Sequence, residues 1–377
     1  MATENINPFV IAGYVSSKYF CDREKEHAQL VTWLQNGNNV TLIASRRMGK
    51  TGLISHCFEN KAIKQQFRTF FVDIYATKSL NDFIFLLSKN ILSQLKPLGM
   101  KAIEHFLSAI KSLRAEISID AAGIPSLNLG VQPTMQAEQS LDEIFQYLNK
   151  SDKPCCVAID EFQQIASYPE KNAEAMLRTY VQKSPLTRFI FAGSQRHLMG
   201  EMFISPARPF FASTSMLYLE SINLDKYIEF AQIHYKAARK IVEHQVIENI
   251  YNLFDGVTWY VQKVLNEIYA TLMPGQTFRP DHLPVIISRI VASYKYYFSD
   301  SLHRLPEKQG KLLVAIAKEG TVKAPTSSDF VKKYNQISAS SVQSALSGLL
   351  EKDFVTREQN MYSVYDKFFA IWLKENF

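Results

Sequence analysis

The sequence predicts an α/β fold, in which helices cover both faces of a parallel sheet, with a helical lid and a C-terminal winged helix. Three observations predict it. Short apolar runs alternate with helical spacing in the first part of the chain, helical periodicity alone follows, and three helical patterns with two short strands come last. At roughly 150 residues per domain, 377 residues make two or three domains. We expect boundaries at 1–220, 221–300 and 301–377.

Apolar, β-rich runs predict the strands of the sheet. They lie at 40–43, 69–75, 155–159, 188–192 and 216–219. Several of these runs are apolar throughout, which is typical of strands buried on both faces of a parallel sheet. Helical spacing at 80–95 and 140–148 predicts helices between them, so the core is expected to have three layers.

One segment of the core departs from this alternation. Residues 114–131 alternate with period two around a Gly-Ile-Pro sequence, and this pattern predicts a β-hairpin inserted before the strand at 155.

Helical patterns dominate the rest of the chain. They fill 223–272, until Met-Pro-Gly at 273–275 interrupts them, and we expect the lid there. Three further patterns follow at 307–317, 327–334 and 338–350, and the short strand-like pieces DFVT and MYSV come after them. Three helices and a two-stranded wing predict a winged helix.

A predicted phosphate-binding loop joins the first strand to the first core helix. Its candidate nucleotide contacts are Ala44, Ser45, Arg46, Arg47, Met48, Gly49, Lys50, Thr51 and Gly52. Unpaired N–H groups and the helix dipole favour an anion at such a helix start. In a P-loop the lysine neutralises the β- and γ-phosphates and the following hydroxyl ligates Mg²⁺, so Lys50 and Thr51 are assigned these roles, with ATP and Mg²⁺ as cofactors. The alternative is an exposed turn with solvated basic side chains.

Ala44 stands where the GxxxxGK[ST] pattern has its first glycine. If that position needs a positive φ, the methyl group costs about 1 kcal/mol.

An acidic pair closes the apolar strand at 155–159. We assign Asp160 to the metal, through its water shell, and Glu161 to the catalytic base that orients and deprotonates the attacking water. A solvated pair at a strand end is the alternative.

Further polar residues follow the next strand. Ser194 and Gln195 are placed to sense the γ-phosphate if their strand lies between the first strand and the acidic one, and simple solvation is the alternative. Arg208 is the candidate charge-stabilising finger, acting in cis or from a neighbouring subunit, and Arg196 is its rival. For either arginine an ordinary surface position is the alternative, and the sequence slightly favours it.

Together these segments resemble the archaeal-type ATPase family within the AAA+/STAND P-loop NTPases. FCDREKE resembles the family's Phe-x-x-Arg-x-x-Glu box, SRRMGKT its loop, VAIDEFQ its second motif and FAGSQ its third. The resemblance implies that Phe20 and Arg23 lie near the adenine. FDGVTWY matches the family's lid motif loosely, with Thr258 where relatives often carry proline, and the lid shows no clear sensor arginine. These departures imply slow turnover.

Charge and composition limit the other partners. The chain carries 42 Lys and Arg against 36 Asp and Glu, a net charge of +6 that does not by itself indicate nucleic acid. Residues 301–377 carry 11 Lys and Arg against 8 Asp and Glu, which is weak for phosphate binding. A DNA-binding winged helix therefore remains an alternative to one that packs on the ATPase core to restrain the nucleotide switch or docks a protein partner. The expected partners of the chain are ATP and either a protein partner or a second copy of the chain.

Other classes of protein find little support in the sequence. No HxxxH pair or GxSxG elbow occurs, and the apolar runs are too short for a membrane span. Four cysteines without metal-type spacing fit a reducing cytoplasm. We expect an Mg²⁺-dependent ATPase that acts as a nucleotide-driven conformational switch. An ATP-gated DNA-binding regulator and a nucleotide-binding scaffold with little turnover are the alternatives.

Overall fold

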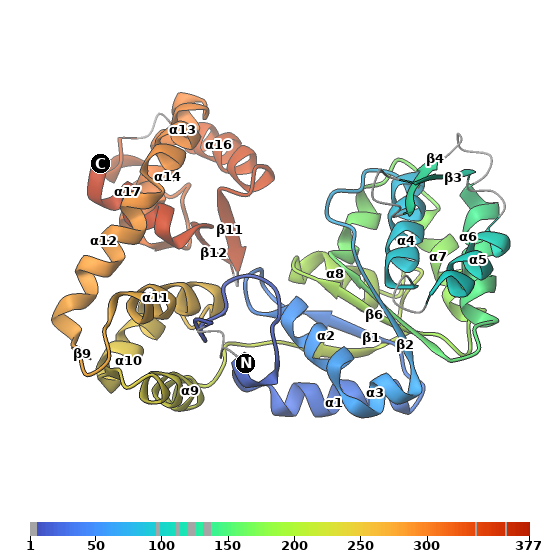
Figure 1. Ribbon diagram of the computed structural model, residues 1–377. Helices are drawn as coiled ribbons and strands as arrows, with labels where there is room; N and C mark the ends of the chain where they lie inside the picture. The colour runs from blue at the N-terminus through green and yellow to red at the C-terminus, as the bar shows by residue number, and fades with distance from the viewer. Residues whose placement is uncertain are drawn as a thin grey trace. The chain divides into compact units, whose positions relative to one another are not determined.

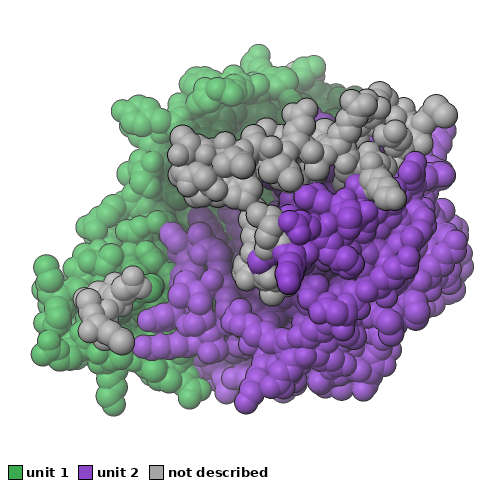
Figure 2. Space-filling view, turned by 45° about the vertical axis from the view of Figure 1, so that its right-hand side comes forward, with its two compact units in different colours: residues 1–9, 227–256, 260–377 green, residues 10–226, 257–259 purple. Residues whose placement is uncertain are grey.

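The computed structural model describes residues 6–95, 99–110, 114–119, 125–130, 137–335, 338–358 and 360–377. The chain forms two compact units, coloured separately in Figure 2. The sheet unit comprises residues 10–226 and 257–259, and the helical unit comprises residues 1–9, 227–256 and 260–377. The three domain boundaries expected from the sequence stay a prediction.

The sheet unit is built on a parallel sheet of five strands. In spatial order they are β2 (Arg68–Asp73), β5 (Cys155–Asp160), β6 (Arg188–Gly193), β1 (Val40–Ile43) and β7 (Ser215–Tyr218). The predicted α/β class is confirmed. Strand β6 lies between β1 and β5, which was the condition set for a γ-phosphate sensor at its end. Since all five strands are parallel, their carboxyl ends meet at one edge of the sheet.

Alternating side chains divide the core of this unit into two layers. Along β5, Val157 and Ile159 pack into one hydrophobic cluster, whereas Ala158 packs into the other. Strand β6 does the same with Phe191 and Ala192. Because successive side chains of a strand point to opposite faces, these all-apolar strands need helices on both sides.

Helices cover both faces of the sheet (Figure 1). On one face lie α1 (Glu24–Gln35), α2 (Lys50–Glu59) and α3 (Lys61–Gln66). On the other lie α4 (Leu80–Leu95), α6 (Ala137–Asn149), α7 (Ala173–Gln182) and α8 (Arg196–Ile204), with α5 (Met100–Ala109) beside α4 and α6. The unit also contains the 3₁₀ turns η1 (Ser17–Tyr19) and η4 (Phe162–Ser167).

The predicted hairpin is present as an antiparallel pair. Strand β3 (Arg114–Ile119) pairs with β4 (Pro125–Gly130), and Glu116 is opposite Asn128. Residues 120–124 and 131 of the predicted hairpin lie outside the described residues.

The helical unit contains most of the predicted lid and the winged helix. Its elements before residue 304 are α9 (Leu224–Ala237, which starts in the sheet unit), β8 (Ile241–Val242), α10 (His244–Leu253), α11 (Thr258–Thr271), β9 (Thr277–Phe278), η5 (Pro280–His282), α12 (Leu283–Ser293) and α13 (Lys295–His303). The first two residues of α11 also belong to the sheet unit. The two short strands, β8 and β9, pair in parallel.

The winged helix has the predicted order of elements. It contains α14 (Glu307–Glu319), β10 (Thr321–Val322), α15 (Ser328–Lys333), α16 (Ala339–Glu351), β11 (Val355–Glu358), β12 (Met361–Val364) and α17 (Lys367–Asn376). Three side chains cap the helix starts, since Ser327, Ser338 and Asp366 accept backbone N–H groups of α15, α16 and α17. The predicted wing is the β11–β12 hairpin, and β10, which the sequence analysis missed, adds a third strand.

None of the helices described here combines the length and the apolar character that crossing a bilayer requires.

Candidate functional site

The predicted phosphate-binding loop leads from β1 into α2, and its backbone turns at two residues. Arg47 has a φ of 69° and Gly49 a φ of 90°, while Lys50 opens the helix. Ala44 is buried, donates its N–H to the carbonyl of Gly193 at 3.2 Å, and is not among the residues with positive φ. The cost considered for its methyl group therefore does not arise. The strained non-glycine position of the loop is Arg47.

Two carbonyl groups of the loop are held by partners outside it. The backbone N–H of Trp259 donates to the carbonyl of Arg47 at 3.0 Å. The carbonyl of Met48 accepts from Arg23 at 3.3 Å and from the Thr258 hydroxyl at 3.4 Å. In a trans peptide the N–H points away from the C=O of the same peptide. Because the carbonyls of Arg47 and Met48 are held on one side, the N–H groups of Met48 and Gly49 point to the opposite side of the loop. Such a row of amides is what an anion needs.

The two arginines of the loop lie over aromatic rings. The guanidinium of Arg47 is 4.6 Å from the Trp259 ring centroid, and that of Arg46 is 5.4 Å from the Tyr75 centroid. Trp259 lies in the first turn of α11 and Tyr75 in the turn after β2, so the two arginines contact separate segments of the sheet unit.

Lys50 joins the loop to the acidic strand end. Its Nζ lies 3.1 Å from Asp160 Oδ1 and 3.2 Å from Glu161 Oε1. Burial works to lower the pKa of Lys50, but the two carboxylates outweigh it and the pKa is raised. Thr51 donates its hydroxyl to Asp160 Oδ2 at 2.7 Å. The structure thus brings together the four residues assigned to phosphate, metal and base.

Glu161 sits at the junction of β5 and η4 in a left-handed conformation, with a φ of 57°. Ser194 donates its hydroxyl to Glu161 Oε2 at 2.6 Å. Burial works to raise the pKa of Glu161, but Lys50 and the hydrogen-bond donors outweigh it, so the pKa is lowered. The carboxylate is therefore ionised near neutral pH and able to accept a proton.

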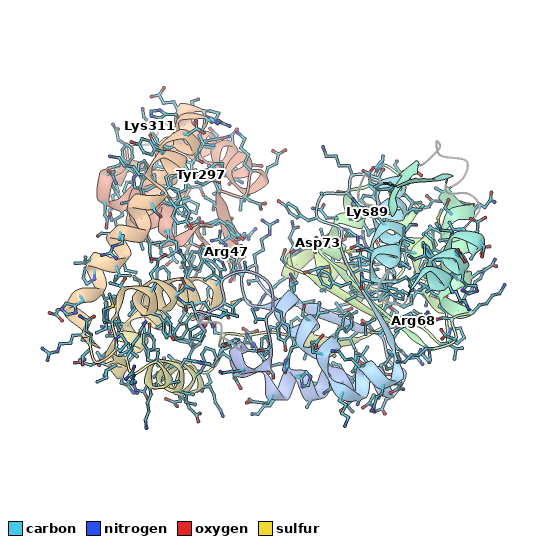
Figure 3. All side chains as sticks on the ribbon, in the orientation of Figure 1. Arg47, Arg68, Asp73, Lys89, Tyr297 and Lys311 are labelled. Carbon is cyan, nitrogen blue, oxygen red and sulfur yellow. The ribbon has the colours of Figure 1, made fainter. Side chains whose placement is uncertain are left out.

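Two residues at this edge were missed by the sequence analysis. Gln163 donates to Glu161 Oε2 at 2.5 Å, although it lies within the VAIDEFQ motif that signalled the strand end. Asp73 ends β2 in register with Asp160, and Figure 3 labels it at one end of that strand with Arg68 at the other. Burial raises the pKa of Asp73, and the neighbouring carboxylates Asp160 and Glu161 raise it further. Asp73 could have been found from the sequence, because the neighbouring strands β2 and β5 each end in a charged residue.

The remaining predicted residues lie apart from this cluster or are held elsewhere. Gln195 is exposed at the start of α8. Arg196 contacts the Glu220 carboxylate at 3.3 Å and the Leu219 carbonyl at 3.2 Å. Arg208 pairs with Glu174 at 2.7 Å and with Glu201 at 3.5 Å, so its guanidinium is engaged within the sheet unit. Its role as a finger stays a prediction.

Phe20 and Arg23, expected near the adenine, contact different parts of the loop and its helix: Phe20 lies against α2, and Arg23 bonds the Met48 carbonyl. The Phe20 ring stacks on His56 of α2, with centroids 4.5 Å apart, and a Cβ added to Gly52 would stand 3.2 Å from it. Tyr14 approaches the same ring and donates or accepts at His56 Nδ1, at 2.9 Å. Arg23 is only 4% exposed and pairs with Glu26 at 2.7 Å. The hydrogen bond from Arg23 to the Met48 carbonyl fixes the backbone of the loop.

The oxygen ligands at the sheet edge suit Mg²⁺. This ion commonly takes one or two protein oxygens and completes its shell with water and phosphate. The Thr51 hydroxyl and the Asp160 carboxylate supply such a pair. In the described part of the chain, no three or more His, Cys, Asp or Glu side chains are grouped so that they could hold a metal ion.

Family models match most of the chain. A model described as an ATPase domain predominantly from Archaea matches residues 20–270, and one described as a probable winged helix domain matches residues 296–375. No curated protein matches.

Solved structures share the fold over nearly the whole chain. The Walker-type ATPase of Pyrococcus abyssi is 18% identical, with a TM-score of 0.63, over 97% of this chain and 99% of that one. The ORC2 protein of Aeropyrum pernix, solved as ADPNP–ADP complexes, is 13% identical, with a TM-score of 0.59, over 99% and 96%. The ORC1 protein of the same organism, solved in complex with DNA, is 11% identical, with a TM-score of 0.53, over 95% and 93%.

Proposed function

The chain belongs to the family of ATPase domains found predominantly in Archaea, and from this premise we propose that it is an Mg²⁺-dependent ATPase that uses ATP as a conformational switch. The convergence of Lys50, Thr51, Asp160 and Glu161 on one sheet edge is the observation that carries the proposal. The nucleotide's phosphates lie along the loop amides, as the resemblance to P-loop proteins implies.

Lys50 exchanges partners when ATP binds. Without phosphate its charge is balanced by Asp160 and Glu161, which keeps a buried cation paired. The β- and γ-phosphates offer more negative charge to the same ammonium, so Lys50 turns to them and releases the two carboxylates. Asp160 and Thr51 would hold Mg²⁺ at this edge, and the ion would neutralise charge on the phosphates.

Glu161 is the base in the hydrolytic step. It accepts a proton from the water whose oxygen attacks the γ-phosphorus, while the bond from that phosphorus to the bridging oxygen breaks and ADP leaves. Ser194 holds one oxygen of this carboxylate from the neighbouring strand. The order of strands supports this part of the proposal, because β6 places Ser194 between the loop and Glu161.

Hydrogen bonds between the start of α11 and the loop support the proposed conformational switch. Thr258 and Trp259 bond the carbonyls of Met48 and Arg47, and the same helix continues into the helical unit. A change in the loop on phosphate binding therefore acts directly on the first turn of α11. Switching requires that ATP bind the two states with different affinity, and contacts of this kind are one source of that difference.

The exposed side chains of α16 in the winged helix fit a protein partner better than DNA. Along α16, which is described in full, the exposed side chains are small, amide or acidic and include no cation; they are Ala339, Ser340, Gln343, Ser344, Ser347 and Glu351. Phosphate binding depends on Lys and Arg, and guanine readout on arginine. The alternative of an ATP-gated DNA-binding regulator is eliminated if the protein fails to bind duplex DNA at low salt with ATP present.

Replacing Glu161 by glutamine tests the base. Glu161→Gln keeps the size of the side chain and one acceptor oxygen but cannot accept the proton, so ATP should bind as in the wild type while multiple turnover is lost. Steady phosphate release is measured with and without Mg²⁺, together with ATP affinity. Undiminished release by Glu161→Gln, or full activity of the wild type without a divalent ion, contradicts the proposal. Readily measured turnover by the wild type excludes a scaffold that only binds nucleotide.

A further inference from the structure

Gln163 is a buried amide at the start of η4, two residues after Glu161, and is only 2% exposed. A buried amide needs hydrogen-bond partners to offset the loss of water. The partners of Gln163 are the carboxylate of Glu161, the proposed base, and the hydroxyl of Ser194.

The two donors converge on a single oxygen. Glu161 Oε2 accepts from Gln163 Nε2 at 2.5 Å and from Ser194 Oγ at 2.6 Å, and the two donors lie 3.4 Å apart. The amide has one possible orientation, because turning it over would set its oxygen against the carboxylate. Gln163 Oε1 consequently points away from the carboxylate and has no hydrogen-bond partner in the described part of the chain.

The other oxygen of Glu161 faces the reaction. Oε1 contacts Lys50 Nζ at 3.2 Å, and this ammonium is the group that marks the phosphate position. Oε2 is thus tethered by two neutral donors, whereas among the described residues Oε1 is bonded by Lys50, the cation that turns to the phosphates in the proposed function. A carboxylate fixed in this way cannot rotate its free oxygen out of line.

Space for the amide is provided by a glycine. A Cβ added to Gly193, the last residue of β6, would stand 2.6 Å from Gln163 Oε1 and 2.4 Å from Met199 Sδ. These are separations that real Cβ atoms do not show, so a side chain at residue 193 and the observed position of Gln163 exclude each other.

Resting on the proposed role of Glu161 as base, we propose that Gln163 is a positioning residue, which together with Ser194 tethers Glu161 Oε2 so that Oε1 is aimed at the attacking water. Gln163 acts through Glu161 and does not touch the nucleotide. Its loss should therefore lower kcat and leave ATP affinity and KM unchanged.

The test compares Gln163→Met with Gln164→Met. Methionine matches glutamine in length but donates no N–H, and Gln164 is the next residue of the same turn, bonded instead to the Tyr75 carbonyl. Removing an outer partner of a catalytic group costs about 10- to 100-fold in activity. We expect this loss in the kcat of Gln163→Met, with wild-type kcat for Gln164→Met and wild-type ATP affinity for both.

A double-mutant cycle separates positioning from general damage. If Gln163 acts only through the base, adding Gln163→Met to Glu161→Gln causes no further loss in single-turnover hydrolysis. A further loss of the same factor, or a wild-type kcat for Gln163→Met alone, overturns the inference. Gln163→Leu is measured in the same way if Gln163→Met does not fold. Retained turnover by Glu161→Gln itself is the distinct result that removes the proposed function.

Discussion

Lys50 is a buried cation whose neighbours compensate for its missing water. Asp160 and Glu161 each approach its ammonium to within hydrogen-bonding distance, and together they raise its pKa against the effect of burial. A buried charge is stable only when it is paired, so the arrangement holds the site ready without leaving a charge exposed to the apolar core. The same pairing explains why phosphate must compete for Lys50.

Gly193 has no space for a side chain, so its replacement by alanine should destabilise the protein. In Gly193→Ala the new methyl group meets Met199 and Gln163, so we expect the free energy of unfolding to fall by about 1–3 kcal/mol. Gly200→Ala is the matched control, since Gly200 lies inside helix α8 with nothing within 4 Å of an added Cβ. There alanine should be neutral or stabilising by about 0.5–1 kcal/mol.

Urea unfolding measures both substitutions. Equal midpoints for Gly193→Ala and Gly200→Ala would show that the space beside Gln163 is not filled as described.

The single residues show what the sequence could predict. The sequence predicted that four residues lie close together, because each occupies the end of a strand or the start of a helix and parallel strands bring those ends together. These residues are Lys50, Thr51, Asp160 and Glu161. Gln163 was missed because its importance depends on the direction of one side chain within a 3₁₀ turn. No spacing rule specifies that direction.

At the scale of elements, the start of α11 is joined to the phosphate-binding loop. Trp259 donates its backbone N–H to Arg47, receives the Arg47 guanidinium on its ring and donates its indole N–H to the Ile11 carbonyl at 3.0 Å. An indole in such contacts reports changes in the loop.

A variant that retains only Trp259, with Trp33→Phe and Trp372→Phe, should change its emission when ATP binds. The chain has three tryptophans, so this variant isolates the signal. The change should saturate at the ATP concentration that calorimetry gives for binding, because both report one event. The variant that keeps only Trp33 controls for absorption of light by the nucleotide. Saturated binding with unchanged Trp259 emission would contradict the coupling of α11 to the loop.

The elements were predicted unequally well. Helix α4 and the five sheet strands followed from strong apolar patterns, whereas β8, β9 and β10 have two residues each and leave no periodic signal. The loop backbone could not be predicted either. The glycine pattern drew attention to Ala44, but the positive φ angles of the loop fall at Arg47 and Gly49. The strained residue is Arg47, and the backbone N–H of Trp259 bonds its carbonyl.

At the scale of the whole molecule, the chain passes between its two units several times. The crossings lie after residues 9, 226, 256 and 259, and the last two flank the segment that bonds the loop. The sequence predicted a core, a lid and a winged helix from successive periodicities. It could not show that three residues of the lid motif belong to the sheet unit, because that depends on long-range contacts.

Lys50 is expected to hold a triphosphate at the carboxyl edge of the sheet, and calorimetric titration of ATP into Lys50→Ala measures this contact. The control is Lys61→Ala, which replaces an exposed lysine at the start of α3. We expect Lys50→Ala to lose at least about tenfold in ATP affinity, while Lys61→Ala binds ATP like the wild type. Equal ATP affinity in the wild type and in a folded Lys50→Ala protein would show that Lys50 does not hold the triphosphate.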